Sequence, residues 1–109
     1  MNLFFIAEPA AEGEQVESLY QNGNVRIERI VSGGQVSPDG FWYEQDEDEW
    51  VLVVQGEGRI QYESGEEIVL CPGEHLLLPA GKRHRVSYTS KNPCCIWLCV
   101  FSGKEGGTQ

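Results

Sequence analysis

The sequence predicts an all-β domain, and three observations lead to this prediction. Its 109 residues are enough for one domain and too few for two. Thirteen glycines and five prolines supply many turn positions, which suits short strands better than long helices. From Val25 onward, apolar residues follow the period of strands, in runs separated by turn signals at roughly 8–12 residues. Such a series of short strands favours a closed sandwich or barrel.

The expected strands cover residues 25–31, 41–45, 49–54, 59–63, 67–71, 74–78, 84–89 and 94–101. The first is rich in β-branched residues and ends before a pair of glycines, and the second is an aromatic run behind a Ser-Pro-Asp-Gly turn. The third is the most hydrophobic run. The next three are separated by turns that contain Gly or Pro. In the seventh, His84, Val86 and Tyr88 are expected to share one face, and the eighth is again apolar.

The remaining residues are expected to flank these strands. Residues 1–24 are predicted to form an N-terminal arm, which could hold a short helix near residues 15–20. Residues 25–101 are predicted to form the barrel, and residues 102–109 a flexible tail.

The chain is strongly acidic, with 17 Asp and Glu against 8 Lys and Arg and a formal net charge of −9. A nucleic-acid binder needs a basic surface to displace counterions from phosphates, and anionic membranes repel an acidic protein. The sequence also lacks an apolar run long enough to span a bilayer and a start with the features of a signal peptide. We therefore expect a cytoplasmic protein with a small-molecule partner and with neither nucleic acid nor membrane as a partner.

The four cysteines, Cys71, Cys94, Cys95 and Cys99, suit a chain kept in a reducing compartment. Their spacings lack the paired Cys-x2-Cys pattern of a thiolate metal site. We expect free thiols that pack as small hydrophobic residues.

Gly73, Pro79, Gly81 and His84 stand at spacings that resemble the second sequence motif of the cupin family, G-x5-P-x-G-x2-H-x3-N. Tyr88 takes the place of the final Asn. The resemblance covers about residues 25–101. It implies a double-stranded β-helix, or jelly roll, preceded by a short N-terminal arm or helix.

The first cupin motif, G-x5-H-x-H-x3,4-E-x6-G, is matched only in its second half, by Glu49 and the glycine seven residues later. In the family, the two His of this motif, its Glu and the His of the second motif hold a divalent metal. The shorter gap puts Tyr43 and Gln45 at the two His positions, whereas the longer gap puts Trp42 and Glu44 there. The shorter gap is preferred because Tyr43 and Gln45 share one strand face and both offer oxygen.

The resemblance therefore implies a metal site made of Gln45, Glu49 and His84. A donor set of nitrogen and oxygen with open positions suits Mn, Fe, Ni or Zn together with water. Because two His ligands of the motif are absent, we expect the divalent metal to be weakly bound or absent.

The resemblance also implies that the barrel binds a small organic molecule. If the chain is catalytic, the family points to a metal-dependent dioxygenase, isomerase, epimerase or decarboxylase. Tyr43, Glu49 and His84 are the expected catalytic residues, with Glu49 or His84 as general base and with Tyr43 and Tyr88 shaping the pocket. The alternative is a ligand-sensing or partner-binding dimer without metal or turnover, which the loss of the two motif His favours.

Two further sets of basic residues carry expectations. The basic trio Lys82, Arg83 and Arg85 could orient an anionic ligand, but pairing with the acidic run at residues 44–49 is favoured. His75 lies among leucines and is expected to have a structural or surface role.

Cupins commonly dimerise through the edges of their sheets, so the resemblance implies a homodimer. Phe4, Phe5 and Ile6 form an apolar run suited to cross to the partner.

Overall fold

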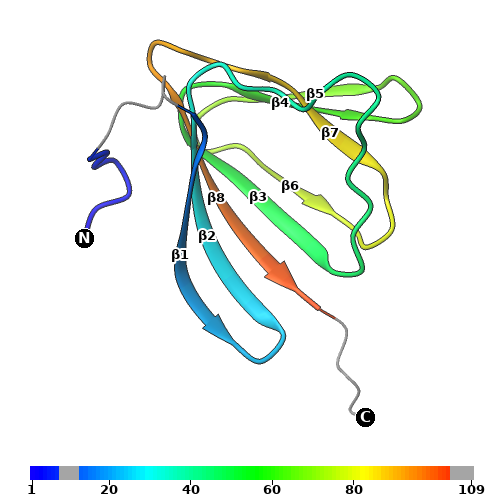
Figure 1. The fold of residues 1–109 in the computed structure, drawn as a ribbon, viewed down its shortest axis with the longest axis horizontal. Coiled ribbons are helices and arrows are strands. Elements are labelled where there is room, and N and C mark those ends of the chain that lie inside the picture. The colour runs from blue at the N-terminus through cyan, green and yellow to red at the C-terminus, as the bar shows by residue number, and fades with distance from the viewer. Residues whose placement is uncertain (8–12, 104–109) are drawn as a thin grey trace.

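The computed structural model describes residues 1–7 and 13–103, which form two antiparallel sheets (Figure 1). The strands are β1 (Gln15–Asn22), β2 (Val25–Ser32), β3 (Asp48–Gln55), β4 (Gly58–Tyr62), β5 (Glu67–Leu70), β6 (His75–Leu78), β7 (His84–Thr89) and β8 (Cys95–Ser102). One sheet has the order β1-β2-β8-β3-β6, and the other has the order β5-β4-β7. The described residues contain no helix, and hence none long and apolar enough to cross a membrane, so the all-β prediction is confirmed.

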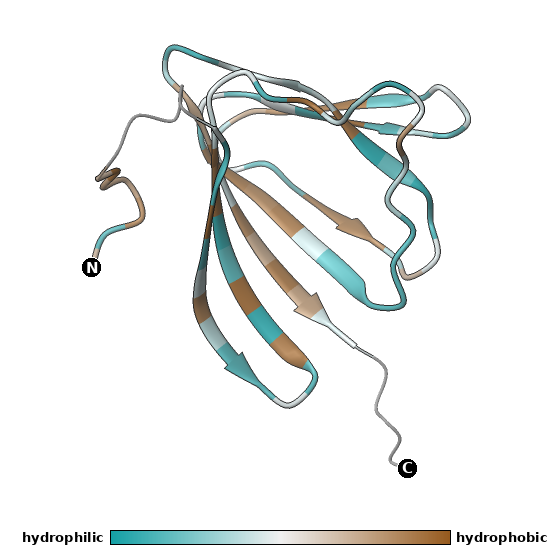
Figure 2. Ribbon diagram, viewed as in Figure 1, coloured by the Kyte–Doolittle hydropathy of each residue, from teal (hydrophilic) through white to brown (hydrophobic). Residues whose placement is uncertain are grey.

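Alternation along β3 and β4 explains how the core forms. Every second residue of β3 from Glu49 to Val53 is buried, and so is every second residue of β4 from Gly58. The main core consists of Val51, Val53, Ile60, Tyr62, Leu70, Leu78, Cys95, Trp97, Cys99 and Phe101. Figure 2 shows hydrophobic residues gathered on β3, β6 and β8, which lie side by side in the larger sheet. Burial of these faces between the two sheets is the main driving force for the fold.

β1 replaces the helix expected near residues 15–20. It pairs with β2 from Gln15↔Val31 to Asn22↔Val25, and the connecting turn contains Gly23 with a φ of 58°. Because β1 lies at the edge of the sheet and almost all its residues are exposed, it needs no apolar alternation, and periodicity did not reveal it. The larger sheet thus extends into the range predicted as an arm. Of the expected tail, residues 104–109 lie outside the described residues.

Residues 41–45 do not form the strand that their alternation predicts. The Tyr43 N–H donates to the His84 carbonyl (2.7 Å), and the His84 N–H donates back to the Tyr43 carbonyl (3.1 Å). The Gly81 N–H donates to the Gln45 carbonyl (2.8 Å). No ladder develops between these contacts because the partner segment is itself a turn, in which the Lys82 N–H donates to the carbonyl of Pro79. The segment is a loop fastened beside His84.

A β-bulge in β7 overturns the expectation that Tyr88 faces the barrel interior. Ile60 pairs with Val86, but its neighbour Arg59 pairs with Tyr88, so Ser87 is an extra residue on the β7 side. The bulge reverses the alternation. Tyr88 is therefore exposed beside the Arg59 guanidinium, which lies 4.6 Å from its ring centroid.

The described cysteines are free thiols, as predicted, although they differ in burial. Cys95 and Cys99 in β8 are buried in the core, whereas Cys71 is exposed and Cys94 is half-buried. The expectation that they pack as small hydrophobic residues is therefore correct for two of the four.

Candidate functional site

A cavity of about 250 Å³ lies between the two sheets and is the candidate functional site. Its apolar lining residues include Val51, Ile60, Leu78 and Trp97, which come from both sheets. The remaining lining carries charged and polar side chains, His84 among them. Such a mixture of apolar surface with a few convergent polar groups is typical of small-molecule sites.

Glu49 lies at the start of β3 and points into the core side of the sheet, where it is 8% exposed. The Gln45 amide nitrogen donates a hydrogen bond to Glu49 Oε1 (3.1 Å). Burial raises the pKa of Glu49, and it outweighs Gln45, His84 and the Cys99 thiol, which all lower it. The pKa of this carboxyl group is therefore higher than that of an exposed glutamate.

His84 begins β7, and its side chain is 6% exposed. Its Nδ1 lies 3.1 Å from the Lys82 carbonyl oxygen, which can only accept, so Nδ1 carries the proton in the neutral ring. The Nε2 lone pair then faces Glu49 Oε1 at 3.8 Å, which is too long for a hydrogen bond. A ligand atom between these two groups could contact both.

Tyr43 and Gln45 reach the cavity from the loop that precedes β3. The Tyr43 ring stacks on His84, with centroids 5.4 Å apart and an interplanar angle of 23°. Trp42 and Glu44 are not among the residues that line the cavity. The structure thus places beside Glu49 and His84 the pair that the shorter motif gap predicts.

The cavity also contains residues that sequence reasoning missed, above all Arg26 and Glu28 on β2. Arg26 Nη1 donates to both carboxylate oxygens of Glu47 (2.6 and 2.8 Å), and its Nε donates to Glu28 (3.2 Å). The Arg26 guanidinium also lies over the Phe101 ring, 3.9 Å from its centroid. The only signal in the sequence was the spacing of Arg26, Glu28 and Ile30 on one strand face, which is equally typical of a solvated face.

Glu14 and Cys99 complete the polar lining that the sequence did not reveal. Ser32 Oγ donates to Glu14 Oε2 (2.8 Å), which brings the carboxylate to the sheet from the segment before β1. The Cys99 thiol hydrogen-bonds to Glu49, and burial raises its pKa well above the usual range. It is therefore a hydrogen-bond donor and not a thiolate nucleophile.

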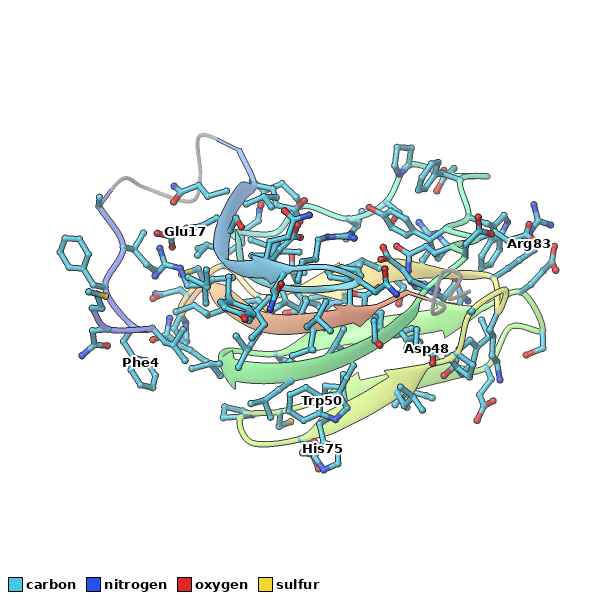
Figure 3. The ribbon with its side chains drawn as sticks, turned by 90° about the horizontal axis from the view of Figure 1, so that it is seen from below. Phe4, Glu17, Asp48, Trp50, His75 and Arg83 are labelled. Carbon is cyan, nitrogen blue, oxygen red and sulfur yellow. The ribbon has the colours of Figure 1, made fainter. Side chains whose placement is uncertain are left out.

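The basic trio pairs with the acidic run, as favoured, through one of its three members. Arg83 reaches the acidic run through an ion pair with Glu44 (3.3 Å), at the rim where Figure 3 shows it. Lys82 instead lies over the Tyr62 ring (4.0 Å), and Arg85 donates to a backbone carbonyl (2.7 Å). None of the three lines the cavity, so they do not orient a ligand there.

His75 occupies a surface position on β6, as expected. The Trp50 Nε1–H donates to His75 Nδ1 (3.3 Å), and Figure 3 shows both rings together on the outer side of the larger sheet. His75 is exposed and does not line the cavity.

The donor set does not complete a divalent metal site. Among the described residues, no three His, Cys, Asp or Glu side chains gather in a way that could hold a metal ion. Glu49 and His84 offer one donor each, but Gln45 turns its amide nitrogen, which cannot ligate, toward the carboxylate. Two donors are fewer than the three or four that resident zinc sites use.

A family model described as "Cupin domain" matches residues 27–101. Among solved structures, the chain is similar to a protein of Ralstonia eutropha JMP134 named as a candidate mannose-6-phosphate isomerase. The two share 40% identity with a TM-score of 0.89, covering 94% of this chain and 96% of that one.

Two further structures share the fold at lower identity. A cupin superfamily protein of Desulfitobacterium hafniense DCB-2 is 22% identical, with a TM-score of 0.76 and coverage of 92% of this chain and 84% of that one. A protein of unknown function from Rhizobium leguminosarum bv. viciae 3841 is 21% identical, with a TM-score of 0.69 and coverage of 94% and 97%. A search among curated proteins finds no match.

Proposed function

This chain belongs to the cupin family, and we propose that its barrel binds a small organic molecule against Glu49 and His84. The observation that carries the proposal is the 3.8 Å gap between His84 Nε2 and Glu49 Oε1, two buried groups that face one cavity without a hydrogen bond between them. The cavity of about 250 Å³ lies just below the common range of ligand pockets, ~300–1,000 Å³. The ligand is therefore a small metabolite.

Glu49 and His84 form a pair suited to moving a proton on the bound molecule. The raised pKa of Glu49 lets its carboxyl group keep a proton to a higher pH than an exposed glutamate, and the His84 ring in its neutral form offers Nε2 as an acceptor. Tyr43 holds the imidazole from one side by ring stacking. A proton-transfer reaction such as an isomerisation is the catalytic form of this proposal.

A divalent cation is held weakly if it enters this site. Glu49 and His84 would be its ligands, and Gln45 or Tyr43 would have to turn an oxygen toward it. Mn, Fe, Ni and Zn all suit such nitrogen and oxygen donors, but the site lacks the additional imidazoles that would hold them tightly.

Ligand binding and metal binding can both be tested on wild type, on His84→Ala and on a control, His75→Ala, which removes the exposed histidine of β6. A panel of three- to six-carbon sugars, hydroxy acids and amines is titrated into ¹⁵N-labelled protein. We expect at least one compound to shift the amides of Tyr43, Glu49 and Cys99, and His84→Ala to weaken its binding by about tenfold, the loss of one charge-assisted hydrogen bond. His75→Ala should bind normally. Absence of any shift at these amides would contradict barrel binding.

Elemental analysis of the same three proteins tests the metal. We expect less than one equivalent of metal in each. A full equivalent that disappears only in His84→Ala would contradict weak binding. Turnover of a bound compound would favour the enzyme over the alternative, a ligand-sensing or partner-binding module.

We also propose that two copies associate through the N-terminal arm. Phe4 and Phe5 are 58% and 67% exposed, and Figure 3 shows Phe4 at the outer edge of the molecule. Ile6 instead packs against Val31 and Ile96 of its own chain. Light scattering should give twice the chain mass of 12.2 kDa, and a Phe4→Asp, Phe5→Asp variant should be monomeric. A monomeric wild type at working concentration would remove this proposal.

A further inference from the structure

The cavity is lined by more negative than positive side chains. Among the described residues that line it, Glu14, Glu28 and Glu49 are carboxylates and Arg26 is the one Lys or Arg. The basic residues around His84 lie outside the lining. A ligand therefore meets an excess of formal negative charge in a site that is partly shielded from water, where charges interact more strongly than in solution.

The charge of Arg26 is already compensated by carboxylates. Glu47 takes two hydrogen bonds from Nη1, and Glu28 takes one from Nε. Glu47 compensates the charge of Arg26 without itself lining the cavity. An incoming anion would have to compete with two carboxylates for this guanidinium, whose face is also covered by Phe101.

Two buried groups that face the cavity, His84 and Glu49, have acceptor atoms with no hydrogen bond between them. His84, with its side chain 94% buried, presents the Nε2 lone pair because Nδ1 is engaged by the Lys82 carbonyl. Glu49 Oε1 is its nearest charged partner and lies beyond hydrogen-bond distance. The Gln45 amide nitrogen, a donor, is already used by Glu49. A ligand that donates hydrogen bonds therefore fits this surface better than one that accepts them.

The apolar lining residues would contact the uncharged part of the ligand. Val51, Ile60, Leu78 and Trp97 offer it a hydrophobic surface within the same cavity as the polar groups. A short carbon chain would be buried there while its charged end faces the carboxylates.

We propose that the pocket selects a small organic cation, an ammonium group on a short carbon chain, over neutral and anionic molecules of the same size. This rests on the proposed function, in which the barrel binds a small organic molecule. The ammonium group donates hydrogen bonds to the carboxylates and to His84 Nε2, and the carbon chain lies against Trp97 and its apolar neighbours.

Three probes of matched size test the proposal: n-butylammonium, 1-butanol and butyrate, titrated separately into ¹⁵N-labelled full chain at pH 7. We expect butylammonium to shift the amides of Tyr43, Glu49 and Cys99 and to bind about tenfold more tightly than butanol, with butyrate weakest. Butanol or butyrate binding as tightly would overturn cation selectivity and leave barrel binding standing. If no probe shifts these amides, the cation proposal fails, and the metabolite panel then decides whether barrel binding fails with it.

Variants distinguish the effect of carboxylates that line the cavity from the effect of the protein's overall negative charge on butylammonium binding. Glu28→Gln removes one carboxylate and leaves Arg26 with less negative charge beside it, so butylammonium should bind about tenfold more weakly and butyrate more tightly. Glu14→Gln should also weaken butylammonium, which covers the case that Glu28→Gln disturbs β2. The control Glu66→Gln removes the same charge from the exposed turn between β4 and β5 and should change affinity less than about twofold. An equal loss in the control would overturn the proposal.

Discussion

Gly58→Ala is expected to destabilise the fold by about 3 kcal/mol, at the upper end of the cost of overpacking a core. Gly58 is buried in β4, and a methyl group there would overlap the six-membered ring of Trp97. The ring is 4% exposed and enclosed by the core, so it cannot move aside without disturbing its neighbours. Because Trp97 also forms part of the cavity wall, the same change should weaken ligand binding.

Urea unfolding of wild type and variant measures this effect. Gly103→Ala is the matched control, because its nearest neighbour, Asn24 Cβ, would lie 3.6 Å from the new methyl group, an ordinary van der Waals contact. We expect the control to stay within about 0.5 kcal/mol of wild type. A Gly58→Ala protein as stable as the control would show that the Trp97 ring is not packed against β4 in this way.

Glu49→Gln is expected to stabilise the fold at neutral pH by about 0.5–2 kcal/mol while it weakens ligand binding. The side chain keeps its size and can still accept from Gln45, but it no longer places a charge in the core. The loss of binding follows from the loss of a carboxylate beside His84. Stability and function therefore change in opposite directions.

The pH dependence has a definite sign. Burial raises the pKa of Glu49 above its ordinary 4.5, so the folded state holds the proton more tightly than the unfolded state. This contribution to stability is complete below the unfolded pKa and is lost as pH rises through the folded pKa. Glutamine does not titrate. The stability of the variant relative to wild type should thus be smallest at pH 4 and increase toward pH 8.

Urea unfolding at pH 4, 6 and 8 checks this, with Glu66→Gln as a control for the loss of an exposed carboxylate. The control should show no such increase. A Glu49→Gln variant that is less stable than wild type at pH 8 would mean that the carboxylate is stabilised in the fold and that the pocket can hold it charged without cost.

The amino-acid sequence is enough to predict the strands in which one face is buried. β3 and β4 lie where alternation predicts them, because every second side chain enters the core. It also determined the position of His84. Gly73 and Gly81 adopt φ values of 89° and 83°, which few other residues accept. The spacing from these two glycines to His84 therefore reflects two turns that favour glycine.

The candidate site could be predicted in part. The motif spacing pointed to Glu49 and His84, and the same-face rule placed Tyr43 and Gln45 beside them. Sequence reasoning could not predict Arg26, Glu28 or Cys99, because their strands carry no motif and reach the cavity through sheet pairing. It could not predict Glu14, which a hydrogen bond from Ser32 brings to the sheet.

Which strand faces meet across the cavity depends on how the two sheets pack. A two-residue period shows which side chains share a face, but it does not say that the polar face of β2 turns toward a cavity. One bulge at Ser87 was enough to move Tyr88 out of the site. β1 became a strand through backbone pairing with β2, a long-range interaction that leaves no periodic trace in an exposed edge. The charge of the pocket, and with it the class of ligand that we propose, therefore follows from the packing of strands that are distant in the sequence.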